Sequence, residues 1–287
     1  MVIEHKVSKM IKKTLIAAGI CLLAAKPLLA EIDVFQWIDN QGRRHYSDRS
    51  KSDAKVLKLA PGATYYVVEK VFDGDTLLLS DGQKVRLLGI NTPEVAGRYK
   101  NAEAGGAQAK DWLHQQLAGR KVRLEGDVEK QDKYQRSLAY VFTEDKRHMN
   151  LELVKQGLAA VNIYPPNLKY VAVLLDAQQA AESAGLGIWG RPEYAPQSFE
   201  ILDDENYRGW KRITGTVRAL KKTSKYSYLQ FSDRVSVRIE NGEGLSSFPD
   251  LQSYVGKFIE ARGWVNKHAG RFVVQIRHPG ELKVSRR

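Results

Sequence analysis

The sequence predicts a mainly β protein with a few helices, in the α+β class, whose strands form two successive five-stranded barrels. Two observations predict this. Short runs rich in β-branched and aromatic residues alternate with turn residues through 65–142 and again through 208–285. In each stretch a helical segment follows the third run of this kind. A chain of 287 residues, 43% of them apolar, is long enough to bury two such cores.

Residues 1–30 have the pattern of a signal peptide. A lysine-rich start precedes an apolar run, Thr14–Ala25, and Leu28-Leu29-Ala30 offers a cleavage site. The run is too short to span a bilayer comfortably, so we expect no stable membrane anchor after cleavage; an uncleaved anchoring helix is the alternative. Cleavage also removes Cys21, the one cysteine of the chain, which excludes disulfide and thiolate chemistry. A periplasmic or secreted protein is expected.

A small β-hairpin module is predicted at 31–60. Two strand-like runs, 34–37 and 43–46, flank turn residues at 39–42. The stretch 48–55, rich in Ser, Lys and Asp, is interpreted as a linker. The module resembles one that recurs at the N-terminus of exported Gram-negative proteins, and it indicates no chemistry.

The first barrel is predicted within 65–190. A three-strand meander begins at Tyr65, and Asp81-Gly82 provides a hairpin turn. Helical periodicity and two more strands follow. The expected elements are strands at 65–72, 76–79 and 84–90, a helix at 102–117, strands at 121–125 and 138–142, and helices at 151–157 and 171–184. Five strands with a helix inserted after the third are typical of the OB-fold.

The second barrel is predicted at 208–285, after a linker that contains Pro192 and Pro196. The pattern of the first barrel returns there, although no repeat is visible in the residues themselves. The expected elements are strands at 213–220, 227–231 and 235–239, a short helix near 245–254, and strands at 258–265 and 272–276. The sequence therefore indicates an OB-like β-barrel.

The net charge of +12 is unevenly distributed along the chain. Residues 65–190 are neutral, whereas residues 191–287 carry +7, so attraction for phosphates is expected mainly in the second barrel. Tyr226, Tyr228 and Gln230 alternate onto one face of its second strand, close to several lysines and arginines. OB barrels bind single strands on this face. The alternative is that the rings belong to the core and the lysines protect a strand edge.

Four short motifs indicate chemistry when they are taken together. Asp73-Gly74-Asp75-Thr76 and Asn91-Thr92-Pro93-Glu94 are each ordinary as turns, Arg86 is ordinary on a strand, and 132–136 is ordinary as a charged hairpin. Jointly they offer oxygen ligands for Ca²⁺, a carboxylate that can activate water, and arginines that bind phosphate. These are the requirements of phosphodiester hydrolysis.

Residues 65–190 resemble staphylococcal nuclease (thermonuclease) over essentially that whole domain. The resemblance is carried by DGDT at 73–76, RLLGINTPE at 86–94, DKYQRSLAYVF at 132–142, LELVKQGLAAV at 151–161 and GIW at 187–189, in the order of the family. It implies a calcium-dependent nuclease on an OB-fold that acts on DNA and RNA with little sequence preference and leaves 3′-phosphate ends.

The resemblance also implies roles for nine residues. Those matching the family's metal ligands are Asp75, Asn91 and Thr92, those matching its catalytic groups are Arg86, Glu94 and Arg136, and those matching its nucleotide pocket are Lys133, Tyr134 and Tyr164. Two positions depart from the family. Asn91 replaces an aspartate, which lowers the expected calcium affinity, and Asn162 replaces a tyrosine of the pocket, which weakens base stacking.

We therefore predict an exported endonuclease with Ca²⁺ as cofactor and nucleic acid as substrate. A monomer is expected, and no protein partner is inferred. The alternative is a catalytically impaired nuclease fold that binds nucleic acid without cleaving it, and Asn91 is the feature that favours it.

Overall fold

A computed structural model describes residues 32–59, 64–97 and 101–285, and the chain divides into two compact units, 1–63 and 64–287. The predicted signal peptide at 1–30 lies outside the described residues. Within those three ranges no helix is long and apolar enough to cross a membrane.

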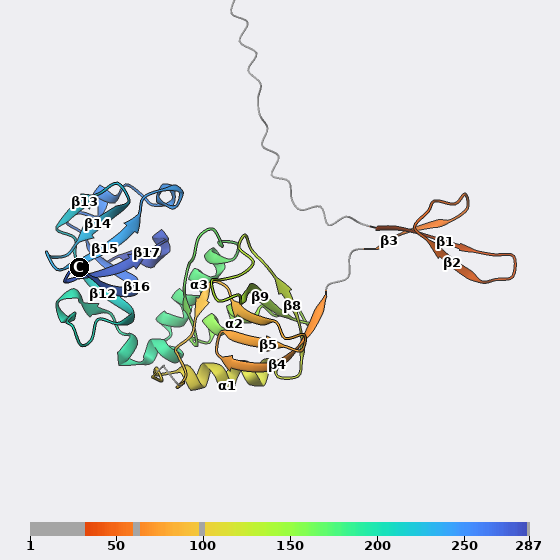
Figure 1. The fold of residues 1–287 in the computed structure, drawn as a ribbon, viewed down its shortest axis with the longest axis horizontal. Helices are drawn as coiled ribbons and strands as arrows, with labels where there is room; N and C mark the ends of the chain where they lie inside the picture. Colours follow the sequence, from red (N-terminus) through yellow and green to blue (C-terminus); the bar gives the residue numbers. More distant parts are fainter. Residues whose placement is uncertain (1–31, 60–63, 98–100, 286–287) are drawn as a thin grey trace, which may run out of the picture. The chain divides into compact units, whose positions relative to one another are not determined.

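The described part of the first unit is a three-stranded antiparallel sheet (Figure 1). The strands, in order across it, are β2 (Arg44–Ser47), β1 (Ile32–Ile38) and β3 (Lys55–Leu59). β1 and β2 form a hairpin, and β3 adds a strand that the sequence pattern did not predict. Trp37 stacks on His45 with ring centroids 5.2 Å apart, and Lys51 Nζ lies 4.5 Å from the tryptophan ring.

The first barrel is a closed five-stranded sheet with the order β4-β5-β6-β9-β8 (Figure 1). Its strands are β4 (Tyr65–Asp73), β5 (Thr76–Leu79), β6 (Lys84–Leu87), β8 (Lys121–Glu125) and β9 (Ser137–Thr143). The helices around it are α1 (Gly106–Leu117), α2 (Met149–Lys155) and α3 (Val171–Ser183). Fully buried aliphatic side chains from strands and helices, such as Leu77, Leu113 and Leu153, fill the core. The predicted mainly β class and the five-stranded barrel are confirmed.

Two elements of the first barrel differ most from their sequence-based bounds, and α2 runs two residues earlier than expected. The strand expected at 84–90 ends at Leu87, because Gly89 turns the chain with φ of 75°. The chain then forms β7 (Ile90–Asn91), which pairs with β10 (Ala160–Val161) outside the barrel. The helix expected from residue 102 begins at Gly106. Both differences bring loops to the edge of the barrel that carries the predicted motifs.

The second barrel is built from β12 (Gly209–Thr216), β13 (Ala219–Lys222), β14 (Tyr226–Gln230), β15 (Val235–Glu240), β16 (Phe258–His268) and β17 (Arg271–Ile276). The strand order is β12-β16-β17-β15-β14-β13. Only two residues separate β12 from β13, so together they act as one bent first strand that pairs with both neighbours, as β4 does. The parallel pair β15–β17 corresponds to the parallel pair β6–β9. The strand circuit of the first barrel is thus repeated.

Short elements complete the chain. They are the strands β11 (Gln197–Ser198) and β18 (Leu282–Val284) and the 3₁₀ helices η1 (Gly187–Gly190), η2 (Pro192–Tyr194), η3 (Phe199–Ile201), η4 (Glu243–Ser247), η5 (Leu251–Tyr254) and η6 (Pro279–Glu281). The helix expected near 245–254 is replaced by η4 and η5. Pro249 disfavours a helical conformation at Phe248, and Asp250 then caps a new turn by accepting from the N–H of Gln252.

The two barrels are joined by a buried cluster of charges. Arg262 of β16, 3% exposed, bonds the carboxylates of Glu182 on α3 and Glu260 on β16. Arg212 Nε lies 2.7 Å from Glu260 Oε1, and Lys283 Nζ lies 2.9 Å from Glu182 Oε2. Burial raises the pKa of Glu182, but its hydrogen bonds and ion pairs with Arg262 and Lys283 lower it below the usual range. The cluster holds β16 against the helix that covers the first barrel.

Candidate active site

The turn between β4 and β5 meets the loop that follows β7. Gly74 is required at this meeting point, because a Cβ there would lie 2.6 Å from Cγ2 of Thr92. The close approach lets Oδ2 of Asp75 accept a hydrogen bond from the backbone N–H of Thr92 at 2.9 Å. Asp75 is 6% exposed and Thr92 is 3% exposed. Two motifs 17 residues apart in the sequence therefore form one buried corner.

Arg86 connects this corner to Asn91. The Nη2 atom of Arg86 lies 3.0 Å from Oδ2 of Asp75 and donates to Oδ1 of Asn91 at 3.2 Å. Its Nη1 atom donates to the carbonyl oxygen of Leu87 at 2.6 Å. One guanidinium group thus contacts the side-chain oxygens of two predicted metal ligands. The third predicted ligand is the carbonyl oxygen of Thr92, which accepts from Nδ2 of Asn91 at 3.2 Å.

The donor set of this corner fits a divalent cation that prefers oxygen. Oxygens of Asp75 and Asn91 lie within 3.2 Å of a single positively charged nitrogen, so both face the same small space. Ca²⁺ takes carboxylate, carboxamide and carbonyl oxygens of this kind. Among the described residues no group of three or more His, Cys, Asp or Glu side chains is placed to hold a metal ion, and the corner combines one carboxylate with a carboxamide and a carbonyl oxygen. Burial and the neighbouring Asp75 raise the pKa of Asp73 to about 6.

Backbone hydrogen bonds of Glu94 hold this residue beside the corner. Its N–H donates to Oε2 of Glu103 at 2.9 Å, and its carbonyl oxygen accepts from the N–H of Glu103 at 2.9 Å. Helix α1 begins directly against this loop, since a Cβ on Gly106 would lie 2.3 Å from the Glu94 carbonyl oxygen. The half-buried Glu94 side chain lines the cleft described next. Sequence analysis missed Glu103, whose part in the site depends on this pairing of loops.

A cleft of about 850 Å³ gathers most of the predicted residues. Those lining it are Arg86, Asn91, Glu94, Lys133, Tyr134, Arg136 and Tyr164. Asp75 and Thr92 lie behind them, in contact with Arg86 and Asn91. Asn162, the departure from the family pattern, also lines the cleft and contributes no ring. The structure thus brings all nine predicted site residues into one region.

The 132–136 loop points Arg136 into the cleft. Oδ2 of Asp132 accepts from Nε of Arg136 at 2.8 Å, and Oδ1 of Asp132 accepts from the backbone N–H groups of Tyr134 and Arg136. Burial raises the pKa of Asp132, but these hydrogen bonds lower it below the usual range. Tyr134 is 68% exposed, and the charged ends of Lys133 and Arg136 lie 5.0 and 5.5 Å from its ring. The loop therefore offers an open aromatic face beside two cations.

The second barrel supplies part of the cleft wall. Trp264 and Asn266 of β16 line it, together with Arg277, which follows β17. The guanidinium carbon of Arg277 lies 4.2 Å from the ring of Tyr164. Sequence analysis missed these three residues. Their local sequence is that of ordinary strand ends, and only the packing of one barrel on the other reveals their position.

An OB barrel with two arginines and a half-buried glutamate in one cleft, and a buried carboxylate behind them, has the groups that a phosphodiester-cleaving class of protein requires. A model described as staphylococcal nuclease homologue matches residues 84–191, and one described as a domain of unknown function (DUF4124) matches residues 19–65. The thermonuclease of Staphylococcus intermedius is 36% identical over 179 residues, 61% of this chain and 98% of that protein. The thermonuclease of Staphylococcus hyicus is 39% identical over 136 residues, 46% of this chain and 79% of that protein.

Similarity to a further relative extends beyond the first barrel. Endonuclease YhcR of Bacillus subtilis (strain 168) is 28% identical over 251 residues, which are 79% of this chain and 20% of that protein. The near-complete coverage of the first thermonuclease at 36% identity establishes the family. The chain belongs to the staphylococcal nuclease family and is a phosphodiester hydrolase.

Proposed function

We propose that the chain is an exported, calcium-dependent nuclease that hydrolyses DNA and RNA with little sequence preference and leaves 3′-phosphate ends. The observation that carries the proposal is the contact of one guanidinium group, that of Arg86, with Asp75 and Asn91 at the edge of a cleft that also holds Glu94 and Arg136. Membership of a family of thermonucleases supports the same reading.

The arginines bind and stabilise the phosphate. Arg86 and Arg136 are both partly exposed to the cleft, with 15% and 28% of their side-chain surfaces accessible. Planar guanidinium forks bond two phosphate oxygens at once, and they stabilise the negative charge that grows during attack. Asp132 fixes the direction of Arg136. Arg86 contacts the oxygens of Asp75 and Asn91 that would hold calcium, so the ion would displace its guanidinium group from them and free that group for the phosphate.

Glu94 is the proposed general base, and it removes a proton from the water that attacks the phosphorus. The bond between phosphorus and the 5′-oxygen breaks, the leaving 5′-oxygen takes a proton from solvent, and the phosphate stays on the 3′-oxygen. The two hydrogen bonds between the Glu94 backbone and Glu103 fix the backbone position from which the Glu94 side chain extends. Asp75, Asn91 and the carbonyl oxygen of Thr92 would hold the calcium ion. When bound, that ion polarises a phosphoryl oxygen and offsets its charge.

The nucleotide next to the scissile bond is held by Lys133, Tyr134 and Tyr164. Lys133 attracts a terminal phosphate, and the exposed faces of the two tyrosines stack on bases. Stacking does not distinguish one base from another, which supports cleavage with little sequence preference. The same faces accept ribose and deoxyribose strands alike, in accordance with action on both DNA and RNA.

Export to the periplasm or the medium is proposed from the lysine-rich start and the apolar run of residues 1–30. Millimolar calcium outside the cytoplasm would fill a site of modest affinity. We propose a monomer without an obligatory protein partner.

A second candidate function is nucleic-acid binding without cleavage, and Asn91 favours it. A carboxamide brings no negative charge to the metal, so the corner has Asp75 as its single carboxylate ligand. Arg86 then competes for the same oxygens, which would leave the corner without an ion at low calcium.

Calcium-dependent degradation separates the two candidates. Purified protein is incubated with plasmid DNA and with RNA in a calcium titration and in excess chelator. The 3′-phosphate ends are detected by their resistance to labelling at the 3′-end until a phosphatase is added. We expect cleavage only with calcium, and a loss of 10²-fold or more in kcat for Glu94→Gln. Glu129→Gln is the matched control in the same cleft and should lose less than tenfold. Binding without cleavage in wild-type protein would select the second candidate.

A further inference from the structure

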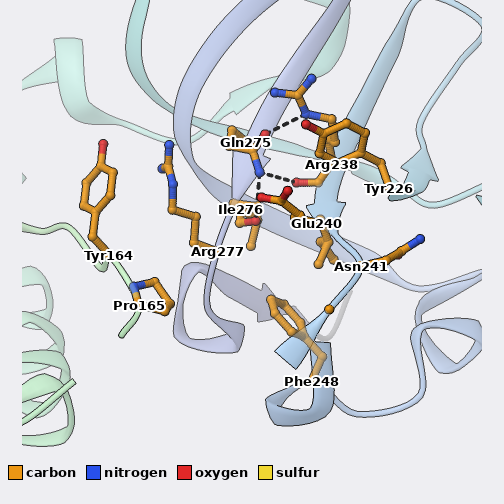
Figure 2. Close-up of a pocket in the computed structure, with 12 residues that line it drawn as sticks. Tyr164, Pro165, Tyr226, Arg238, Glu240, Asn241, Phe248, Gln275, Ile276 and Arg277 are labelled. Atoms are coloured by element: carbon orange, nitrogen blue, oxygen red, sulfur yellow. Dashed lines mark hydrogen bonds between the residues drawn. The ribbon is translucent and has the colours of Figure 1, made fainter. Parts of the chain in front are cut away.

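A second cavity, of about 500 Å³, adjoins the cleft. Tyr164 and Arg277 line both spaces, so this pair lies where the two meet. Figure 2 shows Tyr164 and Pro165 facing Arg277, with Tyr226 and Arg238 farther along, beyond Gln275. The cleft of the first barrel is therefore adjacent to a hollow on the second barrel.

Among the described residues that line these two adjacent cavities are three tyrosine–arginine pairs. In the first pair the guanidinium carbon of Arg136 lies 5.5 Å from the ring of Tyr134, in the second Arg277 lies 4.2 Å from Tyr164, and in the third Arg238 lies 4.6 Å from Tyr226. The first pair belongs to the first barrel and the third to the second barrel. The middle pair takes its tyrosine from one barrel and its arginine from the other.

Glu281 holds the backbone at the arginine of the middle pair. This carboxylate is 6% exposed and accepts from the backbone N–H groups of Arg277 at 2.6 Å and His278 at 3.1 Å. Burial raises the pKa of Glu281 to about 7, and the backbone N–H groups of Arg277, His278 and Ile163 oppose this shift. One buried side chain thus fixes the backbone that carries Arg277 beside the segment that carries Tyr164.

The third pair is held by Gln275 of β17. The Nε atom of Arg238 donates to Oε1 of Gln275 at 2.6 Å, and Nε2 of Gln275 donates to the carbonyl oxygen of Arg238 at 3.3 Å (Figure 2). Tyr226 and Arg238 lie on β14 and β15, the second and third strands of the barrel circuit. In OB barrels this face binds oligonucleotides.

We propose that these three pairs form a track for an unpaired nucleic-acid strand, and that the second barrel holds the strand beyond the nucleotides at the reaction centre. The proposal rests on the proposed nuclease function, and it assigns the substrate class: a single strand longer than the cleft itself. Each tyrosine stacks on a base, and each arginine bonds the phosphate beside it.

An unpaired strand fits this track better than a duplex. Bases in a duplex are stacked on one another, so their faces are closed to protein side chains, whereas a single strand exposes them. The charge of the second cavity agrees with a phosphate chain. Arg238 and Arg277 outnumber its one carboxylate, that of Glu240, which has Lys225 Nζ at 3.8 Å.

The test compares substrates of different length. A fluorescent dinucleotide and a 16-nucleotide single strand are cleaved by the full protein with calcium, and kcat/KM is measured for both. Wild-type protein should prefer the 16-mer, since an OB barrel adds about 4–16 nucleotides of contact. In Tyr226→Ala and Arg238→Gln the ratio of the two values should fall about fivefold or more. Arg271→Gln removes the same charge from an exposed position outside both cavities and should leave the ratio unchanged.

Binding in excess chelator tests the track without catalysis. We expect the anisotropy of the labelled 16-mer to report tighter binding than that of a blunt 16-base-pair duplex, with the preference reduced in Tyr226→Ala and Arg238→Gln. Thermal unfolding shows that each variant is folded. An unchanged length ratio in both folded variants, equal binding of duplex and single strand, or an equal effect of Arg271→Gln would overturn the track. Track binding without calcium-dependent cleavage would instead reject the proposed function alone.

Discussion

Arg86 and Arg238 occupy comparable places in the two barrels and have different surroundings. Each lies half-buried on the third strand of its barrel circuit, between two buried aliphatic residues. Arg86 is bonded to the carboxylate of Asp75, whereas Arg238 is bonded to the neutral amide of Gln275 and lies over the ring of Tyr226. The same strand position therefore serves a fixed charge cluster in one barrel and a stacking surface in the other.

The charges of the two barrels follow this difference. Residues 65–190 are neutral as a whole, and the two arginines of the reaction centre have acidic partners there, Asp75 for Arg86 and Asp132 for Arg136. Residues 191–287 carry +7, and the arginines of the track face tyrosines. A preorganised centre needs paired charges to hold its geometry, whereas attraction of a polyanion needs unneutralised ones. The two proposals together therefore place the chemistry in the first barrel and most of the affinity for the strand in the second.

The largest expected effect concerns the buried charge cluster that joins the two barrels. Arg262→Ala removes the cation that bridges the buried carboxylates of Glu182 and Glu260. Lys283 still neutralises Glu182 and Arg212 still neutralises Glu260, so the loss should lie at the lower end of the range for a broken buried pair, about 3 kcal/mol of the free energy of unfolding. Urea denaturation followed by circular dichroism measures it. The pair of Arg136 and Asp132 is the control, because its more exposed geometry limits the loss in Arg136→Ala to about 1 kcal/mol. Equal losses of unfolding free energy in Arg262→Ala and Arg136→Ala would contradict a buried charge cluster between the barrels.

Next in size is the separation of chemistry from binding. Arg86→Gln removes the guanidinium group that contacts Asp75 and Asn91, and loss of a preorganised charged donor lowers kcat by about 10²–10³-fold. Arg238→Gln should lower kcat on the same short oligonucleotide by less than tenfold, because its side chain lies outside the reaction cleft. Initial rates at saturating substrate and calcium measure both. A similar fall of kcat in the two variants would contradict the proposal that the first barrel catalyses and the second barrel binds.

A smaller effect is expected from restoring charge to the metal corner. Asn91→Asp adds a carboxylate beside Asp75, and the calcium concentration for half-maximal cleavage should fall about tenfold, which corresponds to about 1.4 kcal/mol. A calcium titration of the initial rate measures it. Asn162→Asp adds the same charge at a cleft residue that is not a predicted ligand, and it should change the calcium requirement far less. If both variants shifted the titration equally, Asn91 would have no special role at the ion.

The comparison also shows what the sequence could predict. Strand periodicity and turns located both barrels, because alternation of buried and exposed residues is local; in β14, for example, Ser227 and Leu229 are buried while Tyr226 and Tyr228 are only partly so. Spacing could not predict that Gly89 would divide a strand, since the pairing of β7 with β10 depends on a distant segment.

The site divides in the same way. The motifs around Asp75, Arg86 and Glu94 could be identified because each consists of a short run of neighbouring residues. Glu103 and Arg277 were not, since their roles arise from contacts with Glu94 and Tyr164 across loops and across barrels. Long-range packing supplied what local patterns could not.

The smallest expected effect compares a buried histidine of the first barrel with an exposed one of the second. His148 is 8% exposed, packs on the rings of Phe142 and Tyr170, and has no hydrogen-bond partner for Nε2. Burial lowers its pKa from 6.5 to about 4, although Glu125 and Glu152 oppose this shift. Between these two pH values His148 is protonated in the unfolded chain but neutral in the folded barrel. The free energy of unfolding therefore falls as the pH drops from about 6.5 towards 4.

At pH 5.5 this linkage should cost about 1 kcal/mol relative to pH 7.5, and His148→Phe should remove that part of the acid sensitivity because the ring can still stack on Phe142. Urea denaturation at the two pH values gives the difference for each protein. His268→Phe, at an exposed position on β16, is the control and should retain the wild-type difference. An unchanged difference in His148→Phe would assign the acid sensitivity to other groups, and the two barrels would no longer differ in this respect.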